Sequence, residues 1–168
     1  MLTVGDGNFT YSCVLAQTGR YAVTATTYEA SPTGPNDNVV ATLASVGAKV
    51  FFGVDCGELP DGAFDRVIFN FPVALGRAGD RRQRALLRRF FGAASGRLAP
   101  GGEVWVTLES GQGERWDAAD AAAEGGLLLL RRESAAVSSA KIFLILILTQ
   151  GRTITYVVRI PELEKSSS

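Results

Sequence analysis

The sequence predicts an α/β fold in which a doubly wound, mostly parallel sheet is flanked by helices. Segments rich in β-forming residues alternate with segments of helical periodicity, and strands joined through helices run parallel. Glycine turns separate many of these segments. A hydrophobic fraction of 46% over 168 residues is enough for one core but not for two. We therefore expect a single domain over residues 1–160.

The first half of the chain is predicted to alternate strictly between strand and helix. Strands are expected over 2–4, 21–27 and 49–54, and helices over 9–17 and 38–46. Gly19 and Gly47 follow the two helices, at the place where glycine commonly ends a helix.

Longer elements are predicted in the second half. Strands are expected over 64–72, 103–108 and 127–130, and helices over 80–98 and 116–123. The clearest is the helix over 80–98, because Leu87, Phe90 and Ala94 recur at helical spacing opposite a row of arginines. It is expected to cover one face of the sheet.

The last part of the chain, residues 137–168, differs in composition from the rest and is treated as an atypical tail. Residues 1–136 contain only one isoleucine, Ile68, whereas five lie in the tail. Strands are expected over 141–148 and 153–160, as an antiparallel C-terminal edge of the sheet, with a frayed end over 162–168.

Composition excludes several classes of site and partner. The chain has no histidine, and its two cysteines, Cys13 and Cys56, lack the spacing of a metal motif, which excludes a zinc site and a histidine-based triad. We expect no metal. The net charge is zero, and the longest apolar run, 142–148, is far shorter than the ~20 residues of a membrane span. We expect an intracellular monomer with no membrane partner.

The first glycine turn predicts a ligand site. The apolar run 2–4 leads into Gly5-Asp6-Gly7-Asn8, whose glycines permit a sharp turn and a close approach to a ligand. A dinucleotide fingerprint requires a third glycine at position 10, where Thr10 stands, so NAD and FAD are disfavoured. S-adenosylmethionine, which carries no pyrophosphate, is the better candidate. The alternative is an ordinary tight turn.

Polar residues follow the other strands at the same predicted edge of the sheet. Glu29 is placed to accept hydrogen bonds from ribose hydroxyls. Asp55 is placed to accept a hydrogen bond from an adenine amino group, and the backbone N–H of Cys56 offers a hydrogen-bond donor beside it. The segment Asn70-Phe71-Pro72 offers an amide and an aromatic face to a flat substrate, and Asn70 also borders the cofactor. The alternatives are a solvated carboxylate at 29, a turn or N-cap aspartate at 55, and a strand terminator at 70–72. Their convergence favours an adenosyl pocket.

One basic patch lies between the strands over 64–72 and 103–108. Its members predicted to contact RNA phosphates are Arg77, Arg81, Arg82 and Arg84. The alternative is a solvated helix face that is balanced by acidic residues elsewhere.

Together these motifs resemble the rRNA (uridine-N3)-methyltransferase-like domain family. The resemblance runs over about residues 2–132 and is carried by 4–12, 26–29, 52–55, 64–72, 86–91, 101–108 and 111–116. It implies a Rossmann-like, class I methyltransferase architecture and methyl transfer from S-adenosylmethionine to N3 of a uridine in large-subunit rRNA. It also implies an rRNA partner and a location in the nucleolus, the nucleus or the cytoplasm. By resemblance, residues 5–8 form the cofactor loop and residues 70–72 the substrate-side loop.

Two departures from the family pattern concern the substrate side. Val73 follows Asn-Phe-Pro where the family commonly has histidine, and Glu109 stands where lysine is usual. No residue is an obvious catalytic base. These departures keep open the alternative of a catalytically degenerate module that binds RNA or protein, whereas the intact glycine loop favours an enzyme.

Overall fold

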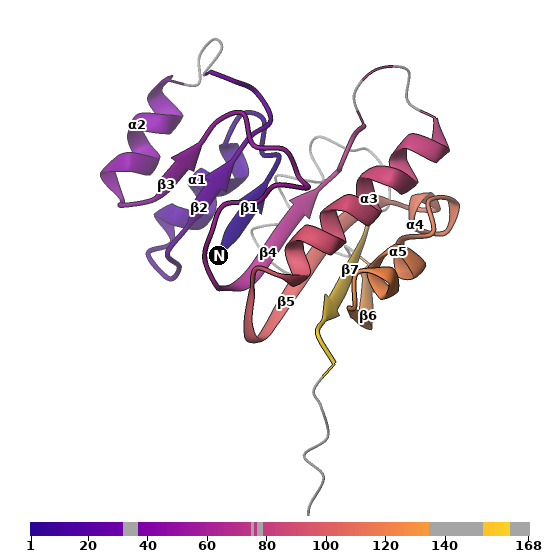
Figure 1. Ribbon diagram of the computed structural model, residues 1–168. Coiled ribbons are helices and arrows are strands. Elements are labelled where there is room, and N and C mark those ends of the chain that lie inside the picture. The colour runs from indigo at the N-terminus through magenta and orange to yellow at the C-terminus, as the bar shows by residue number, and fades with distance from the viewer. Residues whose placement is uncertain (32–36, 75, 77–78, 135–152, 162–168) are drawn as a thin grey trace, which may run out of the picture.

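The computed structural model describes residues 1–31, 37–74, 76, 79–134 and 153–161. In this part of the chain, one seven-stranded sheet is flanked by helices (Figure 1). The strands are β1 (Leu2–Val4), β2 (Thr24–Thr26), β3 (Lys49–Phe51), β4 (Phe64–Asn70), β5 (Leu98–Glu109), β6 (Leu128–Ser134) and β7 (Thr153–Arg159). The helices are α1 (Thr10–Gln17), α2 (Asp37–Ser45), α3 (Asp80–Ser95), α4 (Gln112–Arg115) and α5 (Ala118–Glu124).

The strand order is β3-β2-β1-β4-β5-β7-β6. The first five strands run parallel, with β1 between β2 and β4. The carboxyl ends of these strands therefore meet at one edge, and the order reverses beside β1, where open α/β sheets bind ligands. The predicted fold class is confirmed.

Each face of the sheet has its own apolar cluster. In Figure 1, α3 crosses in front of β4 and β5, and its Leu87, Phe90 and Phe91 are fully buried in the larger cluster together with residues of β1, β4, β5, β7 and α5. The smaller cluster lies on the opposite face, where Leu15 of α1 and Leu43 of α2 pack with Ile68 of β4. The helices thus cover both faces, as a doubly wound sheet requires.

The element boundaries differ most from expectation around the α3–β5 turn. Helix α3 ends at Ser95, not at residue 98, and β5 begins at Leu98, not at residue 103. Leu98 pairs with Phe64, and an irregularity in the pairing absorbs the residues before Glu103. The short helix α4 was not predicted, because a single helical turn gives no periodic signal.

The antiparallel strand expected over 153–160 is β7, but it does not form the edge of the sheet. β7 pairs with β5 on one side and with β6 on the other, antiparallel to both, so that β6 is the edge strand. Its Tyr156, Val157 and Val158 are buried. The strand expected over 141–148 lies outside the described residues.

Candidate cofactor site

A cavity of about 530 Å³ opens at the carboxyl ends of β1, β3 and β4. Gly5 lines it from the end of β1, Asp55 and Cys56 from the segment after β3, Phe71 from the end of β4, and Arg82 from α3. Its size lies within the range of roughly 300–1,000 Å³ that is typical of small-molecule sites. The sequence placed the site at this edge, and the structure brings Gly5, Asp55, Cys56 and Phe71 together there.

Of the two loop glycines, Gly5 is required by packing. Its φ is +63°, and a Cβ at this position would lie 2.8 Å from Cε2 of Phe69. Gly7 is different, because no heavy atom lies within 4 Å of the position that its Cβ would occupy. A side chain at residue 7 would therefore extend into open space beside the loop.

The polar side chains of the loop turn back onto α1. Oδ2 of Asp6 accepts from the backbone N–H of Ser12 at 2.7 Å and from its hydroxyl at 2.5 Å, and Asn8 Oδ1 accepts from the N–H of Thr10 at 3.1 Å. Burial raises the pKa of Asp6, and the hydrogen bonds from Ser12 oppose that rise. Because these carboxylate and amide oxygens occupy the first N–H groups of α1, the helix start offers no phosphate site, which agrees with the case against NAD and FAD.

Glu29 lies beside a second hollow rather than in the main cavity. This hollow, of about 510 Å³, is lined by Tyr28, Glu29, Ala30, Ser31 and Gly53. Tyr28, whose side chain is 55% exposed, lines both hollows. The backbone carbonyl of Glu29 accepts from the N–H of Gly53 at 2.7 Å, which joins the segments that follow β2 and β3.

Asp55 and Cys56 lie in the wall of the cavity. The Asp55 carboxylate already has partners within the protein, and the Cys56 thiol is protonated at neutral pH. Oδ1 of Asp55 accepts from the N–H of Gly57 at 2.7 Å and forms an ion pair with Arg89 of α3 at 2.6 Å. Asp55 thus acts as a turn aspartate, which was the alternative to adenine binding that the sequence left open, because its side chain accepts a hydrogen bond from the backbone two residues on. Burial, with a contribution from Asp55, raises the pKa of the Cys56 thiol to about 11, so this thiol is no nucleophile at neutral pH.

The side chains of the segment 70–72 point to different surroundings: Asn70 contacts α1, whereas Phe71 faces the cavity. The Asn70 amide is hydrogen-bonded to the hydroxyl of Tyr11 in α1, and burial raises the pKa of that tyrosine to about 12. Phe71 lines the cavity and adopts a φ of +50°. Pro72 is buried. Neither Asn70 nor Pro72 is among the residues that line the cavity.

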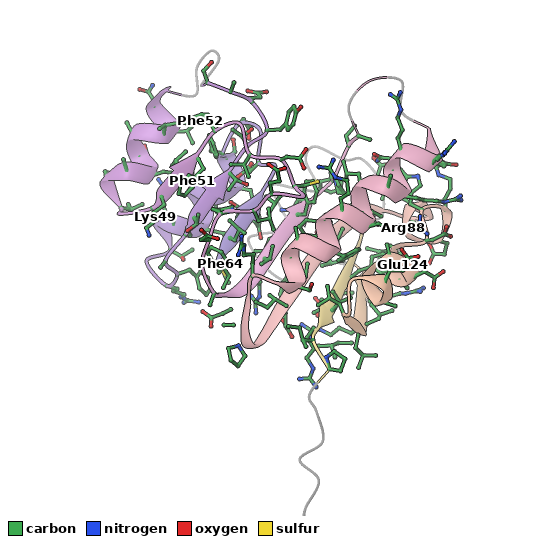
Figure 2. The ribbon with its side chains drawn as sticks, viewed as in Figure 1. Lys49, Phe51, Phe52, Phe64, Arg88 and Glu124 are labelled. Carbon is green, nitrogen blue, oxygen red and sulfur yellow. The ribbon has the colours of Figure 1, made fainter. Side chains whose placement is uncertain are left out.

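The arginine row is largely neutralised within the protein. Arg84 pairs with Asp117 at 2.9 Å, and Arg88 pairs with Glu124 at 2.6 Å, where Figure 2 shows the two side chains meeting between α3 and α5. Arg82 lines the cavity, and Arg81 is exposed in the first turn of α3. The expectation that Arg84 contacts RNA is therefore weakened, because its guanidinium also donates to the carbonyl of Arg115 at 2.8 Å. Arg77 lies outside the described residues.

Sequence reasoning gave no role at the cofactor cavity to several residues that surround it, among them Tyr28, Phe69, Gln83 and Arg89. A usable signal existed for Gln83, because it is the one polar member of an apolar stripe that continues through Leu87, Phe90 and Ala94. Tyr28 and Arg89 lie inside motifs that carry the family resemblance, but no signal in the sequence placed their side chains at the cavity.

Two further observations concern the described residues only. They contain no group of three or more histidine, cysteine, aspartate or glutamate side chains able to hold a metal ion. They also contain no helix with the length and apolar character that crossing a membrane requires.

Comparison with known proteins identifies the fold and the family. Residues 2–139 match the family described as rRNA (uridine-N3-)-methyltransferase BTM5-like. A mouse protein, ferredoxin-fold anticodon-binding domain-containing protein 1 homolog, is 35% identical in an alignment of 153 positions that covers 77% of this chain and 25% of the mouse protein. The chain thus spans about a quarter of that relative's length.

Solved structures give the same architecture at low sequence identity. TrmN from Thermus thermophilus superposes with a TM-score of 0.64 at 18% identity, covering 95% of this chain and 43% of that one. The N-methyltransferase NodS from Bradyrhizobium japonicum WM9, in complex with S-adenosyl-L-homocysteine, gives 0.59 at 15% identity, covering 96% and 77%. The chain belongs to the BMT5-like family and has the fold of class I, Rossmann-like methyltransferases that depend on S-adenosylmethionine.

Proposed function

We propose that this chain is a methyltransferase domain that transfers a methyl group from S-adenosylmethionine to N3 of a uridine in RNA, with large-subunit rRNA as the substrate. One observation carries the proposal: the cavity at the carboxyl ends of β1, β3 and β4 lies where this fold binds ligands, in a chain of the BMT5-like family.

The residues around the cavity suit an adenosyl cofactor. Gly5 lines the cavity, Gly7 leaves the loop backbone accessible, and the capped start of α1 suits a cofactor without a pyrophosphate. Asp55 and Cys56 would border the adenine, and Glu29, beyond Tyr28, would bind the ribose hydroxyls. When bound, S-adenosylmethionine supplies an electrophilic methyl group.

The protein's own contribution is orientation and electrostatics. N3 of uridine carries a proton with a pKa near that of a phenol, about 10, and this proton must leave for nitrogen to attack. Among the described cavity residues, the Cys56 thiol stays protonated at neutral pH and Asp55 is paired with Arg89. The N3 proton would therefore pass to solvent water. Arg82 lines the same cavity, and its guanidinium would stabilise the anionic base while the walls align it for transfer.

RNA binding is assigned to the N-terminal end of α3. The Arg81→Ala variant should bind a single-stranded oligouridylate more weakly and with a salt dependence reduced by about one phosphate contact. The matched Arg84→Ala variant removes an arginine that is paired with Asp117 and should leave that affinity nearly unchanged. Fluorescence anisotropy at several salt concentrations checks both variants, and an equal loss in both would refute the assignment.

A methyl-transfer assay tests the function. The full chain is incubated with labelled S-adenosylmethionine and purified large-subunit rRNA, and the RNA is then digested to nucleosides. Label in 3-methyluridine is the expected result. Label in another nucleoside would refute the uridine N3 assignment, and no label from a folded chain that binds S-adenosylhomocysteine would refute transfer to this RNA.

A catalytically degenerate binding module is the second candidate, and residues on the substrate side favour it. Val73 is 67% exposed at the cavity where the family commonly has histidine. Glu109 places a negatively charged carboxylate at the end of β5, where the family usually has lysine. This carboxylate accepts a hydrogen bond from Gln112 Nε2 at 3.1 Å. Oligouridylate binding by a folded chain without affinity for S-adenosylhomocysteine would favour this candidate.

A further inference from the structure

Gln83 makes two hydrogen bonds to the loop that forms one wall of the cavity. Its side chain projects from the start of α3 and is 5% exposed. Nε2 donates to the carbonyl of Pro72 at 2.9 Å, and Oε1 accepts from the N–H of Ala74 at 2.5 Å. The two bonds bracket Val73, whose exposed side chain lines the cavity.

The loop needs such support because its backbone conformation is unfavourable. Phe71 has a φ of +50°, in the left-handed region that bulky residues rarely adopt and that persists only when surrounding contacts impose it. The N–H of Phe71 donates to the carbonyl of Thr107 at 2.9 Å. Together with the two bonds from Gln83, this contact holds residues 71–74 against β5 and α3.

The chemistry of the position selects an amide. Only a side chain that donates and accepts at once satisfies both the Pro72 carbonyl and the Ala74 N–H. A leucine of similar size would leave both buried groups unpaired. A carboxylate would satisfy Ala74 but would turn a second acceptor toward Pro72.

We propose that Gln83 is a positioning residue that holds the 71–74 loop as a wall of the cavity and thereby sets the affinity for the adenosyl ligand. This role rests on the proposed function, because it assigns the cavity to that ligand. Gln83 itself does not line the cavity; it acts through Phe71, Val73 and Ala74, which do.

The test is Gln83→Glu, which preserves size and shape. At pH 7.5 we expect at least a tenfold loss of affinity for S-adenosylhomocysteine by calorimetry, and faster hydrogen exchange at the Ala74 amide. Burial raises the pKa of a carboxyl group, so lowering the pH protonates this one and restores a donor to Pro72. The difference in affinity between the native chain and the variant should therefore shrink toward pH 5.5.

The matched control is Gln17→Glu, which makes the same charge change at an exposed position near the end of α1 and should leave affinity and exchange unchanged. Native affinity and slow Ala74 exchange in Gln83→Glu at pH 7.5 would overturn the proposal. An affinity that falls together with thermal stability and does not recover at low pH would also overturn it, because that is the signature of a merely structural residue.

Failure of the proposed function gives a different result. If the native chain does not bind S-adenosylhomocysteine, the ligand assignment fails, and Ala74 exchange alone decides whether Gln83 holds the loop. Faster exchange in Gln83→Glu than in Gln17→Glu supports the positioning role, and equal exchange overturns it.

Discussion

The two halves of the sheet are held together in different ways. Strands β1, β2 and β3 have three residues each, whereas β4 has seven and β5 has twelve. Polar contacts connect the short strands to each other and to α1: Thr26 Oγ1 donates a hydrogen bond to the carbonyl of Thr3 at 3.0 Å, and the hydroxyl groups of Thr3 and Ser12 of α1 meet at 2.6 Å. The long strands supply most of the strand residues of the larger apolar cluster, in which the rings of Phe69 and Phe90 are 4.9 Å apart, although Leu2 and Val4 of β1 also belong to it.

This difference indicates a division of labour. The long-strand half buries most of the apolar surface and should supply most of the stability. The short-strand half presents the loops that we assign to the cofactor, and a few hydrogen bonds set their positions. The halves meet at the cavity, where Gly5 of the first half packs against Phe69 of the second.

The largest expected effect comes from the long-strand half. Phe90→Ala empties a fully buried position and should lower the free energy of unfolding by about 3–5 kcal/mol. Phe51→Ala is the matched control in the short-strand half, because Phe51 is 40% exposed on the edge strand β3 (Figure 2). Urea denaturation checks both variants, and a similar loss in the two would contradict the division of labour.

Substitutions of the two loop glycines should separate stability from binding. Gly5→Ala imposes strain at a φ of +63° and a contact with Phe69, so it should lower stability by roughly 1–2 kcal/mol and abolish binding of S-adenosylhomocysteine. The Cβ of Gly7→Val would meet no heavy atom of the protein within 4 Å, so the free energy of unfolding should stay nearly unchanged. The variant should abolish binding, because its side chain would fill the space beside the loop that the proposed function assigns to the cofactor. Unchanged affinity in Gly7→Val would refute the assignment of this loop to the cofactor.

Asp6→Asn should change the pH dependence of stability. Burial raises the pKa of Asp6 above its ordinary 3.8, so folding favours the protonated form. The native chain should therefore lose stability relative to the variant as the pH rises from 3.8 through the raised pKa. Unfolding free energies of both proteins between pH 4 and 7 provide the check. A difference that stays constant, or one that moves the opposite way, would show that burial does not dominate at this carboxylate.

The smallest effect should come from the exposed ion pairs on α3. Arg88 and Glu124 meet at 2.6 Å, but their side chains are 42% and 54% exposed, so solvent screens the attraction. Arg88→Ala should lower the free energy of unfolding only slightly, and less still at high salt. A double-mutant cycle with Glu124→Ala isolates the pair, and a coupling energy as large as the loss expected for Phe90→Ala would contradict this ranking.

The sequence predicted what local patterns encode. The stripe of Leu87, Phe90 and Ala94 indicated α3, and the placement of Gly5 and Asp55 after strands located the cavity edge. Pairings between distant segments were not predictable in this way. Nothing in the local pattern joins Asp55 to Arg89, which is thirty-four residues away, or inserts β7 between β5 and β6.

Within the site, the sequence located residues better than it assigned roles. Asp6 and Asn70 are where the motifs put them, but their side chains bond to Ser12 and Tyr11 of α1. Such intramolecular partners compete with a ligand for the same oxygen and nitrogen atoms, and only the folded chain reveals them. The buried Gln83 is the converse case, since its polar side chain on an apolar stripe was visible in the sequence.

The most direct test of the central claim is calorimetric titration of the folded full chain with S-adenosylhomocysteine, because binding requires no knowledge of the RNA target. We predict a single site of micromolar affinity that Gly7→Val abolishes. No binding by a chain whose circular dichroism shows it to be folded would contradict the assignment of the cavity to an adenosyl cofactor.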